Sequence, residues 1–269
     1  MVNIIVALPG EAKALREALR LRPVAVPAGF SAYQGEEATL VVGGVGKVAA
    51  AGAVMLAAQL NGERPAAGWL NVGVAGHRDS AVGTAFWVNK VTDAATGQCW
   101  FPPSLWPVPL PRKALCTVPV PRQQAGEEDE LYDMEASAFM EMATRFTTGE
   151  LVHCCKIVSD HLHDAAGRVQ AGDVERLVTA RLEAIMALFE AVHRAGCWWR
   201  AEQDLPREPL LERFHFSRSQ RHRLEKLLRR WRALRGDQAV TEAVIGRCRN
   251  AAQVLARLEA CLAELPVRL

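Results

Sequence analysis

The sequence lacks any apolar run of the roughly 18 to 20 residues that a membrane span requires. It has no CxxC pair, and its seven cysteines are an odd number. Cys154 and Cys155 are adjacent and would point to opposite faces of a strand, which disfavours a disulfide framework or a zinc site. The N-terminus has no basic region before its short apolar stretch and no small-residue cleavage site after it. These absences predict a cytoplasmic protein with reduced thiols and no membrane contact.

The charged residues are distributed unevenly along the chain. Residues 1–204 carry 18 Lys and Arg against 23 Asp and Glu, whereas residues 205–269 carry 14 against 7. A split of this kind indicates two parts with different roles. We therefore expect one domain at residues 1–200 and, after the prolines at 206 and 209, a small basic α-helical extension at residues 205–269.

Short apolar segments alternate with helical patterns through the first 195 residues. This alternation predicts an α/β domain with a largely parallel sheet, whose ligand site lies at the carboxyl ends of the strands. A proline-rich segment, Gln98–Pro121, interrupts the pattern. The expected strands are Val2–Leu8, Thr39–Val42, Trp69–Val74, Ala85–Thr92, Ala114–Val118 and Leu151–Val158, and the expected helices are Glu11–Leu21, Lys47–Leu60, Met134–Phe146 and Val174–Ala195.

Four phrases stand at the ends of these strands: IIVALPGEAKAL, VVGGVGKVAAA, NVGVAGH, and the pair YDMEASAF and KIVSDHLHD. In this order they resemble the nucleoside phosphorylase superfamily, and most closely its methylthioadenosine/S-adenosylhomocysteine nucleosidase branch. The resemblance covers about residues 1–195. It implies a phosphorylase-like three-layer domain with a mostly parallel mixed central sheet, a homodimer, a purine nucleoside as substrate, and no metal or organic cofactor.

The resemblance also assigns catalytic and ribose-binding roles. Asp160 matches the acid that protonates N7 of the leaving purine, and general acid catalysis contributes about 10² to 10⁴ in rate. An aspartate at this position implies a 6-aminopurine. Glu135 matches the glutamate that holds the ribose hydroxyls, with Met134 packing against the sugar, and Glu11 aligns with the glutamate that activates water. The structural alternatives are a helix cap or surface turn for Asp160, a first-turn helix residue for Glu135 and a surface helix residue for Glu11.

Further residues are expected around the substrate. Gly44 and Gly46 allow the backbone to come close to a ligand because glycine has no Cβ. Gly76 resembles part of the wall beside the base, and Ser159 precedes the acid as a further binding residue. We expect His77 at the rim of this site.

Two features depart from the pattern or invite another interpretation. The segment between Gly76 and Asp133 is short for this branch. The branch is expected to have an aromatic side chain that stacks on the purine shortly before the ribose glutamate, and this sequence has none there. Trp100 or Phe101 can substitute for it, or both belong to the core. The histidines and aspartate at positions 161, 163 and 164 could suggest a metal site, but a solvated loop is the better interpretation.

Residues 211–235 carry nine Lys and Arg against two Glu, with Phe214, Phe216 and Trp231 interleaved. Such a helix can contact nucleic-acid phosphates and stack on bases. The alternative is a helical bundle whose apolar stripe packs on the main domain or on a second subunit, with its arginines in water.

The sequence therefore predicts hydrolysis of the N-glycosidic bond of a 6-aminopurine nucleoside similar to methylthioadenosine or S-adenosylhomocysteine. Two alternatives stay open. One is a purine nucleoside phosphorylase, in which phosphate replaces water. The other is a catalytically weakened nucleoside-binding module whose helical arm binds nucleic acid or a protein.

Overall fold

The computed structural model describes residues 1–61, 68–120, 129–161, 171–203, 208–235, 240 and 242–264. The chain divides into two compact units, Met1–Trp198 and Trp199–Leu269, called unit 1 and unit 2 below. Within the described ranges, none of the helices combines the length and the apolar character that crossing a membrane needs.

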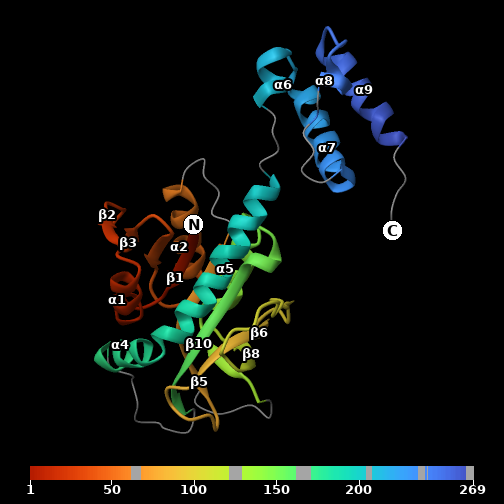
Figure 1. Cartoon of the computed structure of the whole chain (residues 1–269). Coiled ribbons are helices and arrows are strands. Elements are labelled where there is room, and N and C mark those ends of the chain that lie inside the picture. Colours follow the sequence, from red (N-terminus) through yellow and green to blue (C-terminus); the bar gives the residue numbers. More distant parts are fainter. Residues whose placement is uncertain are drawn as a thin grey trace. The chain divides into compact units, whose positions relative to one another are not determined.

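Unit 1 is built on a mixed sheet (Figure 1). Strand β1 pairs in parallel with β4 and β5, and β5 pairs in parallel with β10. From β5 the pairing continues through β10, β6, β8 and β9 and returns to β5, so these five strands form a closed ring. The strands are β1 (Val2–Val6), β2 (Arg22–Val24), β3 (Ser31–Gln34), β4 (Ala38–Val42), β5 (Gly68–His77), β6 (Ala85–Asp93), β7 (Cys99–Trp100), β8 (Arg112–Thr117), β9 (Leu131–Asp133) and β10 (Val152–His161).

Helices cover both faces of the sheet. Because successive side chains of a strand point to opposite faces, Ile4 and Ile5 of β1 enter two different cores. The core around Ile4 is closed by α1 (Pro9–Ala18), α4 (Ala171–Ala180) and α5 (Leu182–Gln203). The core around Ile5 is closed by α2 (Lys47–Leu60) and α3 (Ala136–Ala143). The predicted three-layer α/β class with a mixed central sheet is confirmed.

Several elements differ from the expected ones. The single helix predicted at Val174–Ala195 is two helices, α4 and α5, separated at Arg181, whose Nε donates to the Gly83 carbonyl at 2.6 Å. The helix predicted from Met134 begins at Ala136, whose backbone N–H donates to the Asp133 carboxylate at 2.9 Å. Strands β2 and β3 were not predicted, because both are short and β2 is largely exposed.

Unit 2 contains α6 (Glu208–Arg213), α7 (Arg218–Arg235), α8 (Glu242–Ile245) and α9 (Ala251–Ala263) around a core of its own. The apolar stripe of α7 packs against α9 within this core. Ser217 and Asn250 cap α7 and α9, since each side-chain oxygen accepts a backbone N–H of the first turn.

Candidate functional site

A cavity of about 180 Å³ lies at the carboxyl ends of β1, β5 and β10. Four carboxylates belong to its lining, and we therefore call it the acidic cavity. Six residues expected from the sequence line it, whereas Gly44 and Gly46 do not. The lining residues are Ala7, Leu8, Glu11, Val45, Val74, Ala75, Gly76, Val118, Tyr132, Asp133, Met134, Glu135, Ser159 and Asp160.

Glu11 reaches the acidic cavity from the first turn of α1. Its Oε2 accepts the backbone N–H groups of Ala7 and Leu8, both at 2.8 Å, and its Oε1 accepts that of Val74 at 2.9 Å. The side chain is buried, and this burial raises its pKa in spite of the backbone donors and the nearby Lys156. Oε1 has one backbone donor and so keeps a lone pair for a proton.

Glu135 stands directly before α3 on another wall of the acidic cavity. Its Oε1 accepts the backbone N–H of Gly46 at 2.7 Å and its Oε2 that of Met134 at 3.2 Å. Gly46 has φ +101°, a conformation that favours glycine. Its contribution to the site is the backbone N–H that orients the Glu135 carboxylate. Burial raises the pKa of Glu135, Lys156 opposes the rise, and Asp133 adds to it.

Asp160 and Ser159 both line the cavity although they are consecutive residues of β10. The register of β10 against β5 shifts between Val158 and Asp160, which is a β-bulge. A bulge re-aims side chains locally, and here it brings two neighbours to the same side. The Ser159 hydroxyl donates to Asp160 Oδ1 at 2.5 Å, which fixes the orientation of that carboxylate.

Lys156 is a residue that the sequence analysis missed. It lies on β10, it is 1 % exposed, and its Nζ forms an ion pair with Asp133 Oδ2 at 2.8 Å. Burial alone would lower its pKa, but the carboxylates of Asp133 and Glu135 outweigh burial and raise it, so the side chain is cationic. Its positive charge also lowers the pKa values of Glu11 and Glu135. A lysine within an apolar strand segment was the available signal, because a buried cation requires a carboxylate partner.

Asp93 is another buried carboxylate, and it holds the helices that border the cavity. Its Oδ2 accepts from the Ser137 hydroxyl of α3 at 2.6 Å and from Lys47 Nζ of α2 at 3.0 Å. Burial by itself would raise the pKa of Asp93, but these hydrogen bonds and two backbone donors lower it to about 2. Asp93 thereby joins β6 to the first turns of α2 and α3.

Other expected residues lie away from the acidic cavity. His77 is 1 % exposed, so its placement at a rim is wrong; its Nε2 contacts Asp129 at 2.9 Å and its Nδ1 accepts two backbone N–H groups. Trp100 and Phe101 do not line the cavity, and Phe101 is 69 % exposed. The aromatic side chain in the lining is Tyr132, which belongs to β9.

A metal site was not expected, and His161 Nε2 donates its proton to the Ser80 carbonyl at 3.0 Å. The expected loop residues at positions 163 and 164 lie outside the described residues. Within the described ranges, no group of three or more His, Cys, Asp or Glu is arranged to hold a metal ion.

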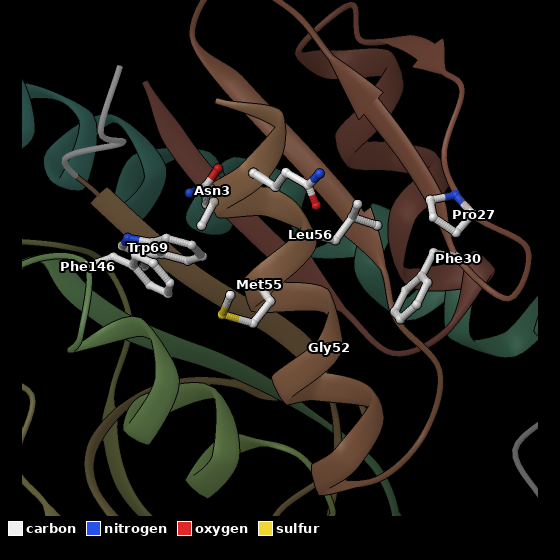
Figure 2. A pocket seen from close by; sticks show the side chains of 10 residues that line it. Asn3, Pro27, Phe30, Gly52, Met55, Leu56, Trp69 and Phe146 are labelled. Atoms are coloured by element: carbon white, nitrogen blue, oxygen red, sulfur yellow. The ribbon is translucent and has the colours of Figure 1, made fainter. Parts of the chain in front are cut away.

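A larger hollow of about 610 Å³ lies beside α2 and carries no titratable side chain among its lining residues. Figure 2 shows Trp69 and Phe146 at one end, Pro27 and Phe30 at the other, and Met55 and Leu56 between them. This lining is apolar apart from Asn3 and Gln59. The hollow offers packing surface and no acid or base, so the acidic cavity is the candidate active site.

The fold of unit 1 is that of the 5′-methylthioadenosine/S-adenosylhomocysteine nucleosidases. The enzyme of Neisseria meningitidis, solved with methylthio-immucillin-A, is 20 % identical over 72 % of this chain and 98 % of its own, with a TM-score of 0.57. The 5′-methylthioadenosine nucleosidase of Arabidopsis thaliana is 16 % identical over 71 % and 95 %, with a TM-score of 0.59.

A futalosine hydrolase from Helicobacter pylori has the same fold, at 11 % identity over 71 % of this chain and 97 % of its own, with a TM-score of 0.58. No protein-family model matches the sequence, and no characterised protein matches it by sequence. The likeness to solved structures therefore concerns the fold.

Proposed function

We propose that unit 1 hydrolyses the N-glycosidic bond of a 6-aminopurine nucleoside and releases the free purine and the sugar. The observation that carries this proposal is one cavity lined by Glu11, Glu135 and Asp160, which come from distant parts of the chain. Their residue types match the water-activating, ribose-holding and base-protonating groups of the nucleosidase branch.

The proposed reaction needs an acid and a base on opposite sides of C1′. As the C1′–N9 bond breaks, Asp160 gives its proton to N7 of the purine, and the bond electrons stay on the base. Glu135 accepts hydrogen bonds from the ribose hydroxyls and stabilises the positive charge that develops on the sugar. Water forms the new C1′–O bond and loses a proton to Glu11, whose Oε1 has a lone pair available.

The charge of the lining favours water over phosphate as the nucleophile. Glu11, Asp133, Glu135 and Asp160 belong to the lining, and the described lining residues include no Lys or Arg. An incoming phosphate dianion would meet these carboxylates, and the nearby cation, Lys156, is buried and already paired with Asp133. The same argument favours a nucleoside over a nucleotide as the substrate. The 5′ substituent stays open, and a thio-substituted one fits the resemblance.

The direct test is to incubate the purified protein with adenosine, inosine, 5′-methylthioadenosine and S-adenosylhomocysteine, each with and without phosphate. We expect adenine release from one or more of the adenine nucleosides at the same rate in both conditions. Release that requires phosphate and yields a sugar 1-phosphate would instead establish the phosphorylase alternative. Binding without release of any base would establish a nucleoside-binding module.

The homodimer implied by the resemblance is proposed to use the outer side of α2. Val48 and Met55 are 89 % and 49 % exposed on this helix, next to the apolar hollow of Figure 2. Large exposed apolar side chains in one region are typical of protein interfaces. Analytical ultracentrifugation should give twice the chain mass for the native protein and the monomer mass for V48D. A native monomer would contradict the proposal.

A further inference from the structure

The exposed face of α7 in unit 2 carries basic side chains that nucleoside hydrolysis does not use. Arg218, His222, Lys226 and Arg230 follow one another at intervals of four residues, and all four are exposed. Residues four apart lie on one face of a helix, and the rise of about 1.5 Å per residue separates them by about 6 Å each. These four residues are called the basic row below, and the row is about 18 Å long.

The opposite face of α7 is occupied within unit 2. Leu224, Leu228 and Trp231 are 1 %, 3 % and 7 % exposed and pack in the core that α7 shares with α9. A helix that lies in a membrane surface has to insert an exposed apolar face, and this helix has already buried its own. The face that α7 presents to solvent is therefore suited to a charged partner, not to a lipid surface.

The aromatic residues near the basic row are not available for stacking on bases. Phe214 and Phe216 are 7 % and 2 % exposed, and with Trp231 they belong to the core of unit 2. The expectation that these three side chains stack on nucleobases is therefore wrong. Recognition by this face has to rest on charge, which favours the phosphate backbone of a duplex over the bases of a single strand.

Among the described residues, the basic row forms no ion pair that would hold unit 2 together. No described acidic side chain forms an ion pair with Arg218, Lys226 or Arg230, whereas Arg223 on the flank of α7 pairs with Glu259 at 2.8 Å. Like charges four residues apart on a helix destabilise it. Lys226 and Arg230 are such a pair, so their spacing is unfavourable for the isolated helix, and a bound polyanion would offset that cost.

We propose that the basic row of α7 binds the sugar–phosphate backbone of a nucleic-acid duplex without reading its sequence. A DNA duplex carries about one negative charge for every 1.7 Å of its axis, so a straight row of cations meets phosphates along its whole length. The surrounding chain adds to the attraction, since residues 205–269 carry 14 Lys and Arg against 7 Asp and Glu. This function is independent of the proposed nucleosidase activity.

The test is fluorescence anisotropy with fluorescein-labelled 20-base-pair DNA and RNA duplexes, titrated with the full chain between 50 and 200 mM salt. We expect log K to fall linearly with log salt, with a slope of about −0.9 for each phosphate contacted. The variant R218Q/K226Q/R230Q should bind at least about tenfold more weakly at 50 mM salt and lose about 0.9 from the slope per removed contact. Binding of either duplex supports the proposal, and the duplex that binds more tightly shows whether DNA or RNA supplies the phosphates.

The matched control is R247Q/R249Q/R257Q, which removes three exposed arginines of unit 2 outside the basic row. All six side chains are exposed, so both triple variants should keep the native thermal unfolding midpoint. We expect the control to retain most of the affinity. An equal loss in both variants would overturn the proposal, as would the absence of duplex binding at 50 mM salt. Tighter binding of phosphatidylserine vesicles or of polyglutamate than of either duplex would also overturn it.

Discussion

At the scale of single residues, the candidate site depends on how its acidic side chains are held. Glu11 and Glu135 are both buried, and backbone N–H groups fix both carboxylates. Lys156 supplies the positive charge among them. Without this cation, several carboxylates in a buried region would repel one another and take up protons.

The substitution K156M should therefore affect both stability and the pH profile. Loss of one partner of a buried ion pair costs about 3 to 5 kcal/mol, which chemical denaturation would measure. Because Lys156 lowers the pKa values of Glu11 and Glu135, its removal should raise them further. The acid limb of kcat/KM, where a base must lose its proton, should then move to higher pH.

Two variants separate charge from packing at this position. K156R keeps the cation and should retain the native acid limb. K156M/D133N removes both members of the pair and should be more stable than K156M alone, since no uncompensated carboxylate is left at Asp133. An acid limb that stays at the native pH in K156M would contradict the assigned role.

Gly73 provides a second test at this scale, because both charged groups lie against it. A Cβ at position 73 would stand 2.9 Å from Glu11 Oε1 and 3.3 Å from Lys156 Nζ, so one of them has to move. We expect G73A to lower kcat/KM at least about tenfold, which corresponds to about 1.4 kcal/mol of transition-state stabilisation.

The matched control is G172A in α4, where a Cβ would meet no atom within 4 Å. Its kcat/KM should equal the native value. A G73A variant with native kcat/KM would show that the position of Glu11 Oε1 is not critical for the reaction.

At the scale of elements, sequence patterns predicted those helices and strands whose apolar residues repeat regularly over many positions. Helix α2 has the predicted bounds, Lys47–Leu60, because small apolar residues fill its buried face. The break at Arg181 was not predicted, since apolar positions continue across it and its cause is a contact with the distant Gly83. Tertiary contacts of this kind leave no local signal.

In the candidate site too, some residues could be predicted from the sequence and others could not. Glu11, Glu135 and Asp160 were predicted as site residues from strand ends and motifs, and they line one cavity, although their catalytic roles stay predictions. Lys156 and Tyr132 were missed, because pattern analysis assigned the first to a plain buried strand and did not consider the second. The bulge that turns both Ser159 and Asp160 toward the cavity cannot be inferred from alternation.

The link that Asp93 makes between β6 and the helices α2 and α3 leads to a testable prediction. Its pKa of about 2 lies below the ordinary 3.8, so its ionised form contributes stability above pH 3.8 that is lost as the pH falls toward 2. The shift corresponds to about 2 kcal/mol. Urea unfolding between pH 2 and 6 should show the native protein losing this stability, while D93N is less stable at pH 6 and has a flatter pH dependence.

The control for Asp93 is D173N, which removes a carboxylate of α4 whose side chain is 47 % exposed and pairs with Arg176. Its pH dependence should follow that of the native protein. Parallel curves for D93N and the native protein would contradict the view that Asp93 links β6 to α2 and α3 through its charge.

At the scale of the whole molecule, the two units have different chemistry. Unit 1 has a nucleosidase fold and an acidic cavity, and unit 2 has a core of its own and an exposed basic row. The two proposals can fail separately, since base release tests the acidic cavity and duplex binding tests α7. The charge split that was visible in the sequence therefore corresponds to two sets of surfaces with different proposed ligands.

The most direct measurement of the central claim is adenine release by D160N compared with D173N, for the nucleoside that the native protein turns over fastest. Asp160 is the proposed acid, and its amide cannot supply the proton that the leaving purine needs. We predict that kcat falls by about 10² to 10⁴ in D160N and stays native in D173N. Undiminished adenine release by a folded D160N variant would contradict the proposed mechanism.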